Sequence, residues 1–175
     1  MCRLARYVLA LLIVVLPAER ALALEHEWHL GASAGYSYLS FDRAPGRNGF
    51  GGQIHARYGL TDAIDLSMSA GATNFFEDGR VLLGTSAGLA YVVDITRWIP
   101  TVGAHIGVVD ILTTRCELAP ALCYHDIRPS VSVPISLEYR ALPSFPVGVR
   151  FEGQFILLGE PSASISFGAY GAFAL

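Results

Sequence analysis

The sequence contains no lysine, and all of its basic side chains are arginines. Charged residues make up only 15% of the chain, against about a quarter in an average soluble domain. The formal net charge is −3, so the chain lacks the basic patch with which nucleic-acid-binding proteins hold phosphates. A soluble domain covers its exterior with Lys, Asp and Glu. The shortage of these residues argues against a water-facing exterior and against a nucleic-acid partner.

Long apolar runs are missing after the first two dozen residues. Arg3 and Arg6 precede an apolar run over 7–16, which Pro17 ends. This run falls short of the roughly 20 residues of a membrane-spanning helix, and an A-x-A cleavage site follows at 21–23. The sequence therefore predicts a secretory signal peptide over 1–23 and an exported mature domain over 24–175.

Cysteine is scarce. Cys2 leaves with the signal peptide, so the mature chain keeps Cys116 and Cys123. An even pair in an exported protein predicts a disulfide, because compartments outside the cytoplasm are oxidising. A metal site with the nearby His125 is the alternative, but two thiols and one imidazole leave zinc one ligand short. We expect the Cys116–Cys123 disulfide, and no metal or other cofactor.

The sequence is rich in alternating apolar and polar residues. Over 50–60 the even positions are apolar or glycine, whereas the odd positions include His55 and Arg57. After an interruption at 61–63, the apolar parity resumes over 64–72. Because side chains alternate across a strand, this pattern predicts a hairpin with one apolar and one polar face. Each arm has about the 9–11 residues that a tilted strand needs to cross a bilayer.

The same pattern repeats along the mature chain and predicts eight strands. They cover 27–38, 50–60, 64–72, 81–93, 101–109, 129–139, 145–157 and 162–175. Their connections are mostly short at one rim and longer at the other, and the longest, 110–128, carries both cysteines. This organisation is typical of an all-β, eight-stranded antiparallel up-and-down transmembrane β-barrel. Some residues at the otherwise polar parity are apolar or aromatic, which we attribute to bulges or register shifts. They are Leu82, Val92, Ile156, Leu158 and Tyr170.

The polar parity consists mostly of Gly, Ser, Ala and Thr. It is too poor in charge for the exterior of a soluble lipocalin-like barrel, the alternative, but it suits the crowded lumen of a narrow barrel. The apolar parity then faces lipid. Aromatic residues support this orientation, because they gather in two girdles near the strand ends. The girdle at the short-turn rim contains Trp28, Tyr58, Tyr91, Trp98, Tyr139, Phe145 and Phe173, and that at the loop rim contains Tyr38, Phe41, Phe50, Phe75 and Phe76.

With its export signal, alternating strands, short turns such as 59–66 (GLTDAIDL) and longer odd-numbered loops, the chain resembles the small outer-membrane barrels of Gram-negative bacteria. The OmpA membrane domain and OmpX are members of this family. Ser166, Gly168 and Phe173 also fit the family's C-terminal assembly signal, although Gly171 stands where an apolar residue is usual. The resemblance implies a protein of the cell outer membrane, surrounded by its lipid. We expect a monomer whose extracellular loops can meet a partner.

Charged and titratable residues also occur at the inward parity. They are His29, His55, Arg57, Asp65, His105, Glu138, Arg150 and Glu152. In a lumen of low dielectric constant such groups should pair. We expect Arg57 and Arg150 to pair with Glu138 and Glu152 in a network that fills the barrel, because eight strands leave only side-chain space inside. A conducting path is the alternative.

The sequence predicts no catalytic residues. Two eight-stranded families that acylate or deacylate lipid A carry a His and a Ser near the outer rim, open to lipid. Here every histidine in a predicted strand has inward parity, and no His-x-Ser triplet occurs. His125 and Asp126 lie in the cysteine loop with Ser130 as the nearest serine, which is weak support for a triad. We favour a non-enzymatic barrel with a structural or surface-interaction role. A narrow channel for ions or small solutes and a lipid A-modifying enzyme are the alternatives.

Overall fold

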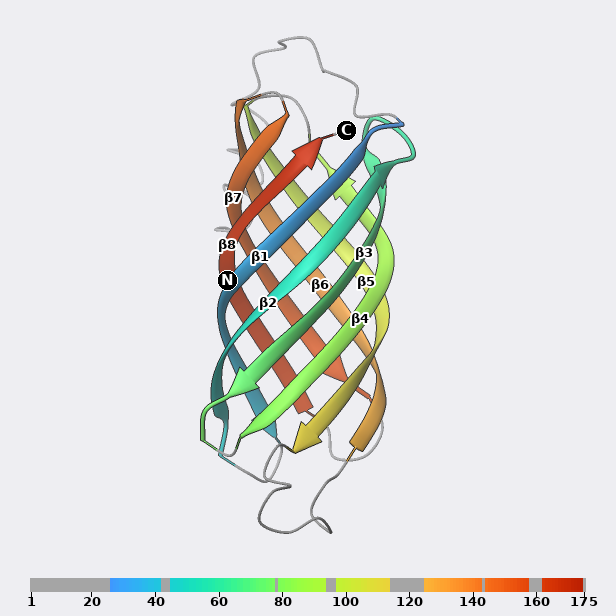
Figure 1. Cartoon of the computed structure of the whole chain (residues 1–175). Helices are drawn as coiled ribbons and strands as arrows, with labels where there is room; N and C mark the ends of the chain where they lie inside the picture. Colours follow the sequence, from blue (N-terminus) through green and yellow to red (C-terminus); the bar gives the residue numbers. More distant parts are fainter. Residues whose placement is uncertain are drawn as a thin grey trace, which may run out of the picture.

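The computed structural model describes residues 26–41, 45–77, 79–93, 97–113, 125–142, 144–157 and 162–174. Antiparallel strands follow one another through these segments and close into a barrel (Figure 1). The predicted fold class is confirmed. The proposed signal peptide, Cys116 and Cys123 lie outside the described residues. Within the described segments there is no helix long and apolar enough to cross a membrane.

The barrel has eight strands in sequence order. They are β1 (Trp28–Phe41), β2 (Arg47–Gly59), β3 (Ile64–Phe75), β4 (Arg80–Val92), β5 (Trp98–Thr113), β6 (His125–Leu142), β7 (Phe145–Ile156) and β8 (Ser162–Ala174). Each strand pairs with the next, and β1 pairs with β8 to close the barrel, so that Ala34 lies opposite Ala169. We call the end with the β2–β3, β4–β5 and β6–β7 connections the short-turn rim, and the opposite end the loop rim. The short-turn rim is at the top of Figure 1.

The first short turn shows why the predicted hairpin breaks at 61–63. The Thr61 hydroxyl accepts hydrogen bonds from the backbone N–H groups of Ala63 (3.3 Å) and Ile64 (3.0 Å). The backbone N–H groups of Leu60 and Thr61 both donate to the carbonyl of Ile64, at 2.9 and 3.1 Å. A threonine hydroxyl that accepts hydrogen bonds from backbone N–H groups two and three residues later competes with strand pairing and stabilises a turn.

The hairpin of β5 and β6 is longer than the sequence pattern predicts. The sequence assigns 110–128 to a loop, but pairing continues to Leu112 and His125. At the other end, β5 begins at Trp98 instead of Thr101. The extra residues carry Asp110 and Asp126, and their charge breaks the apolar alternation without preventing strand pairing. Alternation therefore marks the part of a strand that faces lipid, whereas the strand itself extends beyond it.

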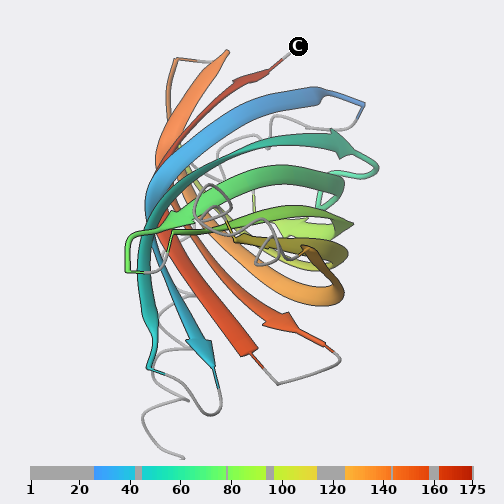
Figure 2. The ribbon, with the colours of Figure 1, turned by 60° about the horizontal axis from the view of Figure 1, so that its bottom comes forward.

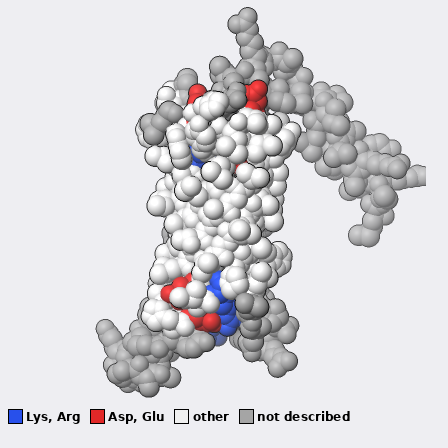
Figure 3. All heavy atoms as spheres, turned by 90° about the vertical axis from the view of Figure 1, so that its right-hand side faces the viewer, with Lys and Arg blue, Asp and Glu red and all other residues white. Residues whose placement is uncertain are grey.

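The exterior of the barrel is an apolar band between two polar ends. Figure 3 shows one face of the molecule, on which acidic and basic side chains gather near the rims and are absent from the middle. Aromatic side chains pair across neighbouring strands at the short-turn rim. These pairs are Trp28 with Tyr58, Trp98 with Tyr139 and Phe145 with Phe173, with ring centroids 5.0, 4.8 and 5.1 Å apart. The apolar parity thus faces outward, as the sequence predicts for a lipid-facing surface.

The predicted girdle at the loop rim needs one correction. Tyr38, Phe50 and Phe76 are exposed, whereas Phe75 is almost fully buried inside the barrel. Phe75 has the inward parity of β3, and it packs among apolar side chains from other strands at the same rim. We call this cluster the apolar cap. It consists of Leu39, Phe75, Leu82, Val109, Ile111 and Ile156.

The apolar residues that the sequence attributes to bulges are also corrected. Leu82 and Ile156 belong to the apolar cap, and Val92 packs on Ile99 near the short-turn rim. Tyr170 is likewise buried inside. The strand register is regular at all four positions, and Leu158 lies outside the described residues. These residues point inward because they keep the inward parity of regular strands. Their side chains fill part of the lumen near each rim. Figure 2, turned towards the loop rim, shows the strands that enclose this interior.

Candidate functional site in the barrel lumen

The inward parity brings all the expected charged and titratable residues into the lumen. His29, His55, Arg57, Asp65, His105, Glu138, Arg150 and Glu152 are all buried. Many of the other inward positions of the barrel are Gly or Ser, which leaves room for these long side chains. Buried charges are costly unless they are paired and hydrogen-bonded. The partners of these groups therefore decide whether the lumen is dry or hydrated.

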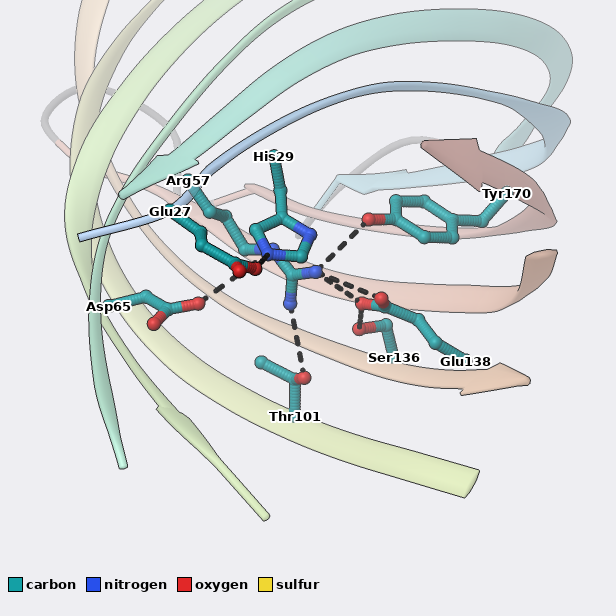
Figure 4. Close-up of polar contacts among 8 residues, drawn as sticks. All are labelled: Glu27, His29, Arg57, Asp65, Thr101, Ser136, Glu138 and Tyr170. Atoms are coloured by element: carbon teal, nitrogen blue, oxygen red, sulfur yellow. Dashed lines mark hydrogen bonds and ion pairs between the residues drawn. The ribbon is translucent and has the colours of Figure 1, made fainter. Parts of the chain in front are cut away.

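Arg57 is the centre of the first ionic layer (Figure 4). Its Nη2 lies 2.8 Å from Oε1 of Glu138 and donates to Oε2 at 2.9 Å. The side chains of Arg57 and Glu138 are 5% and 1% exposed. Since β2 and β6 are four strands apart in a ring of eight, this contact crosses the lumen.

Further polar groups complete this layer. The Arg57 guanidinium donates from Nη1 to the Thr101 hydroxyl (3.2 Å) and from Nη2 to the Tyr170 hydroxyl (3.3 Å). Its Nε lies 4.0 Å from Oδ2 of Asp65. The Ser136 hydroxyl donates to Oε1 of Glu138 at 3.3 Å. One arginine thus links β2 to β3, β5, β6 and β8, and we call this group of residues the Arg57 layer (Figure 4).

The second ion pair joins Arg150 and Glu152, two residues apart on β7. Nη2 of Arg150 lies 3.2 Å from Oε2 of Glu152. The Gln53 amide donates to the same oxygen at 3.1 Å, so the pair is tied to β2. The structure therefore brings the four expected residues together as two separate pairs, Arg57 with Glu138 and Arg150 with Glu152.

The network predicted from the sequence lacks several members of this site. The pattern places Asp65 inside but gives it no partner, and it gives no role to Thr101 or Gln53. Tyr170 stands out as an exception to the polar parity, although it shares that parity with Ser166 and Gly168 on β8. Parity could have placed all four inside. Their contacts depend on the position of each residue along the barrel axis. No local sequence pattern determines that position for strands that are distant in sequence.

Three lumen histidines differ in their surroundings. Nε2 of His29 lies 3.8 Å from the Glu27 carboxylate, and Nδ1 of His105 lies 3.2 Å from the Ser86 hydroxyl. His55 instead stacks on Tyr170, with ring centroids 4.6 Å apart and planes at 18°. Neither ring nitrogen of His55 has a hydrogen-bond partner among the described residues.

A cavity of about 80 Å³ lies between the second ion pair and the apolar cap. Arg150 and Glu152 line one side of it and Leu82 the other, and most of the remaining wall is Gly, Ser or Thr. A polar cavity of this size has room for a few water molecules. The lumen thus contains a small polar chamber between a cap of apolar side chains and a layer of ion pairs.

The geometry offers little for catalysis or metal binding. Within the described segments no group of three or more His, Cys, Asp and Glu side chains could hold a metal ion. His125, which the sequence assigns to the cysteine loop, is instead the first residue of β6. The His125 side chain is 71% exposed, and its Nδ1 lies 3.2 Å from Oδ2 of Asp110. Ser130, the serine considered for a triad, is buried on the lumen side of the same strand.

No protein-family model matches the sequence, and no curated protein matches it either. Solved structures do match. Neisserial surface protein A (NspA) has a TM-score of 0.72 at 13% identity, with 83% of this chain and 96% of that chain covered. The N-terminal β-barrel domain of OprF from Pseudomonas aeruginosa has a TM-score of 0.61 at 18% identity, covering 86% and 98%. The attachment invasion locus protein Ail of Yersinia pestis has a TM-score of 0.57 at 14% identity, covering 86% and 99%.

These similarities show the fold. The chain has the closed eight-stranded architecture of small outer-membrane barrels of Gram-negative bacteria, and it covers nearly the whole length of each of the three structures. Together with the apolar exterior band, they support a location in the outer membrane. They do not assign a role to the lumen or to the loops, so function must be argued from the chain's own residues.

Proposed function

We propose that this protein is a non-enzymatic outer-membrane barrel with a closed lumen, whose loop rim faces the outside of the cell and meets partners there. The observation that carries the proposal is the ion pair between Arg57 and Glu138. It crosses the lumen at 2.8 Å with both side chains almost fully buried. In an open pore these groups would be hydrated, so their burial supports a barrel that does not conduct at neutral pH.

The two ends of the lumen support the same conclusion. The apolar cap fills the loop rim, and the Arg57 layer fills the other half. A constriction lined by apolar side chains resists wetting and so opposes ion flow. The polar chamber between them favours the alternative, a narrow channel. The chamber alone is insufficient, because a channel must also pass both closures.

Hydrogen bonds among Tyr36, Asn48 and Glu77 join neighbouring elements at the loop rim, and we call these three residues the platform. The backbone N–H of Asn48 donates to both carboxylate oxygens of Glu77 at 3.0 Å, and its side-chain amide donates to Oε1 at 2.6 Å. Asn48 also accepts a hydrogen bond from the Tyr36 hydroxyl. These contacts tie β1, β2 and the β3–β4 turn together. They fix the described part of this rim between β1 and the β3–β4 turn.

Orientation and oligomeric state follow from general rules of such barrels. Outer-membrane barrels have short turns on the periplasmic side and longer loops outside, which supports an extracellular position for the connection 114–124. Closure of β1 on β8 leaves no strand edge for pairing with a second chain, which supports a monomer. Ail, a barrel of the same fold, has been solved in complex with the heparin analogue sucrose octasulfate. That a barrel of the same fold binds a ligand supports the proposed role of meeting partners.

An enzymatic role is the weaker alternative. His125 and Asp110 form a pair at the outward face of the loop rim, where a lipid A-modifying enzyme would need its catalytic groups. Ser130 cannot join them, because it points into the lumen. Without Ser130, the serine considered from the sequence, this histidine and aspartate do not by themselves make an acyl-transfer site.

Planar-bilayer recording on the purified protein tests the closed lumen. We expect no steady conductance at neutral pH, and a stable open level would contradict the proposal. Mass analysis of lipid A from cells with and without the protein should show no difference, and an acyl chain gained or lost would support the enzyme instead.

Epitope tags test the orientation. A tag inserted within 114–124 should bind antibody on intact cells. A matched tag between Thr61 and Asp62, in the turn at the opposite rim, should bind only after the cells are opened. The reverse pattern would contradict the proposed role of the loops.

A further inference from the structure

The ring of His55 is a buried polar group near Arg57 that has neither a hydrogen-bond partner nor a carboxylate beside it among the described residues. Its residue is 4% exposed, and neither ring nitrogen has a hydrogen-bond partner among the residues that the structure describes. The residues directly opposite it are Gly31 on β1 and Ser69 on β3, which carry no charge. Gly31 is needed for this placement, because a Cβ there would lie 2.2 Å from Nε2 of His55.

The charges that act on this ring are both positive. They are Arg57, two residues further along β2, and Arg150 on β7. The nearby carboxylates already have arginine partners. Asp65 on β3 and Glu138 on β6 contact Arg57, and Glu152 on β7 contacts Arg150. The phenol of Tyr170 on β8, the remaining titratable neighbour, stacks on the ring.

The other lumen histidines are placed differently. The ring nitrogens of His29 also lack a hydrogen-bond partner among the described residues and arginines lie near it, but its Nε2 lies 3.8 Å from the Glu27 carboxylate. His105 has the Ser86 hydroxyl beside Nδ1, and the charges of both Glu152 and Arg150 act on it. Each can share a proton with an acceptor. A protonated His55 would instead be a buried cation facing two guanidinium groups, and burial of an unpaired charge is strongly unfavourable.

Tyr170 connects this ring to the closure of the lumen. Its ring carries the His55 stack, and its hydroxyl accepts a hydrogen bond from Nη2 of Arg57 at 3.3 Å. Arg57, Glu138, Arg150 and Tyr170 also share a small void of about 10 Å³, so this layer is not fully packed. If His55 becomes charged, its repulsion from Arg57 and Arg150 decreases when Tyr170 moves aside, the guanidinium groups move away from the ring and water enters.

We propose that the Arg57 layer is an acid-sensitive closure, which opens the short-turn half of the lumen to water when His55 takes up a proton. Opening joins the polar chamber to the periplasmic side. The apolar cap contains no titratable side chain, so it stays shut and the opening is one-sided. This property goes beyond the proposed function, which concerns the closed state at neutral pH.

The test is nuclear magnetic resonance on the full mature chain in lipid nanodiscs between pH 8 and 5. The measured quantity is the exchange with water of the Nε–H protons of Arg57 and Arg150, compared at each pH between wild type and His55→Gln. An exposed histidine titrates near 6.5. If opening takes up one proton, the exchange rate of each arginine in wild type, divided by the rate of the same arginine in His55→Gln, should rise below this pH by about tenfold per pH unit. Comparison at equal pH removes the intrinsic pH dependence of exchange.

Matched variants locate the effect. His125→Gln removes an exposed histidine at the loop rim and should behave as wild type, and His29→Gln and His105→Gln should keep the acid response. Should His55→Gln fail to assemble, His55→Phe keeps a ring on Tyr170 without a titratable nitrogen. The proposal is overturned if wild type shows no rise. It is equally overturned if the His55 variants keep the rise, or if His29→Gln or His105→Gln abolishes it.

Discussion

Arg57 and Glu138 lie 81 positions apart in the chain and on opposite sides of the barrel, yet a 2.8 Å ion pair joins them across the lumen. The same guanidinium contacts Asp65, Thr101 and Tyr170. Five of the eight strands are therefore joined through one arginine, namely β2, β3, β5, β6 and β8. All of these contacts come from side chains of the barrel strands themselves.

The lipid-facing exterior makes a first prediction about assembly. Ala104 and Ile135 point outward near the middle of β5 and β6. Ala104→Arg or Ile135→Arg should cost about 2–4 kcal/mol, because the guanidinium would face hydrocarbon. The control is Ser132→Thr, a small change at a buried lumen position. The fraction of heat-modifiable protein on gels measures assembly, and equal yields for the two classes would mean that the faces are assigned wrongly.

A second prediction concerns the apolar cap. Leu82 is 7% exposed inside the barrel, whereas the next residue, Leu83, is 40% exposed on the lipid side. Leu82→Ala should lower the free energy of unfolding by about 2–5 kcal/mol, because it leaves a cavity among packed side chains. Leu83→Ala should cost less, since lipid can fill the space. Urea unfolding in liposomes compares the two, and a larger loss at Leu83 would show that the cap is not packed as described.

Two inward glycines should respond in opposite ways to the same substitution. A Cβ at Gly35 would lie 2.1 Å from the carbonyl oxygen of Phe167 on β8, so Gly35→Ala forces the closing strands apart. A Cβ at Gly84 would first meet Val109, at 3.6 Å, which is ordinary contact. Gly84→Ala should be tolerated or should stabilise by about 0.4–1 kcal/mol through the unfolded chain. Unfolding midpoints measure both changes, and a Gly84→Ala loss as large as that of Gly35→Ala would contradict the described spacing of these strands.

The platform at the loop rim predicts an acid limit. Hydrogen bonds from the side chain and backbone of Asn48 lower the pKa of the Glu77 carboxyl. Because this pKa is lower in the folded protein than in the unfolded chain, the stabilisation is present at neutral pH and is lost as pH falls through the folded value. Titration by nuclear magnetic resonance should give a midpoint for Glu77 below that of an ordinary glutamate. Asn48→Ala should raise it, and an unchanged midpoint would rule out this contact as the cause.

The sequence predicts the architecture well because lipid imposes a strict alternation. Residues such as Ile54, Ile106 and Ile135 must face outward, and this alone defines the strands and the inward parity. The same signal fails where a strand leaves the membrane. Asp110 and His125 interrupt the pattern, so the paired ends of β5 and β6 are predicted as loop.

Contacts inside the lumen are less predictable. Parity places Arg57 and Glu138 inside, but their heights depend on the tilt and closure of all eight strands. Tyr170 and Leu82 illustrate the same problem in reverse. Their parity is inward, but without their partners they look like errors in the pattern. An aromatic or apolar side chain in a polar lumen makes sense only once His55 is known to stack on Tyr170 and Phe75 to pack with Leu82.

A double-mutant cycle on Arg57 and Glu138 tests the central claim, that their ion pair closes the barrel. Arg57→Ala and Glu138→Ala should each lower the free energy of unfolding by about 3–5 kcal/mol, because each leaves the other charge buried without its partner. The double variant should lose less than the sum, by about 0.5–3 kcal/mol. The control cycle is Asp126 with Arg128, a pair whose side chains are 18% and 20% exposed at the loop rim, where the coupling should be at most about 1 kcal/mol. Strictly additive losses at Arg57 and Glu138, or losses no larger than those of the control, would contradict the account.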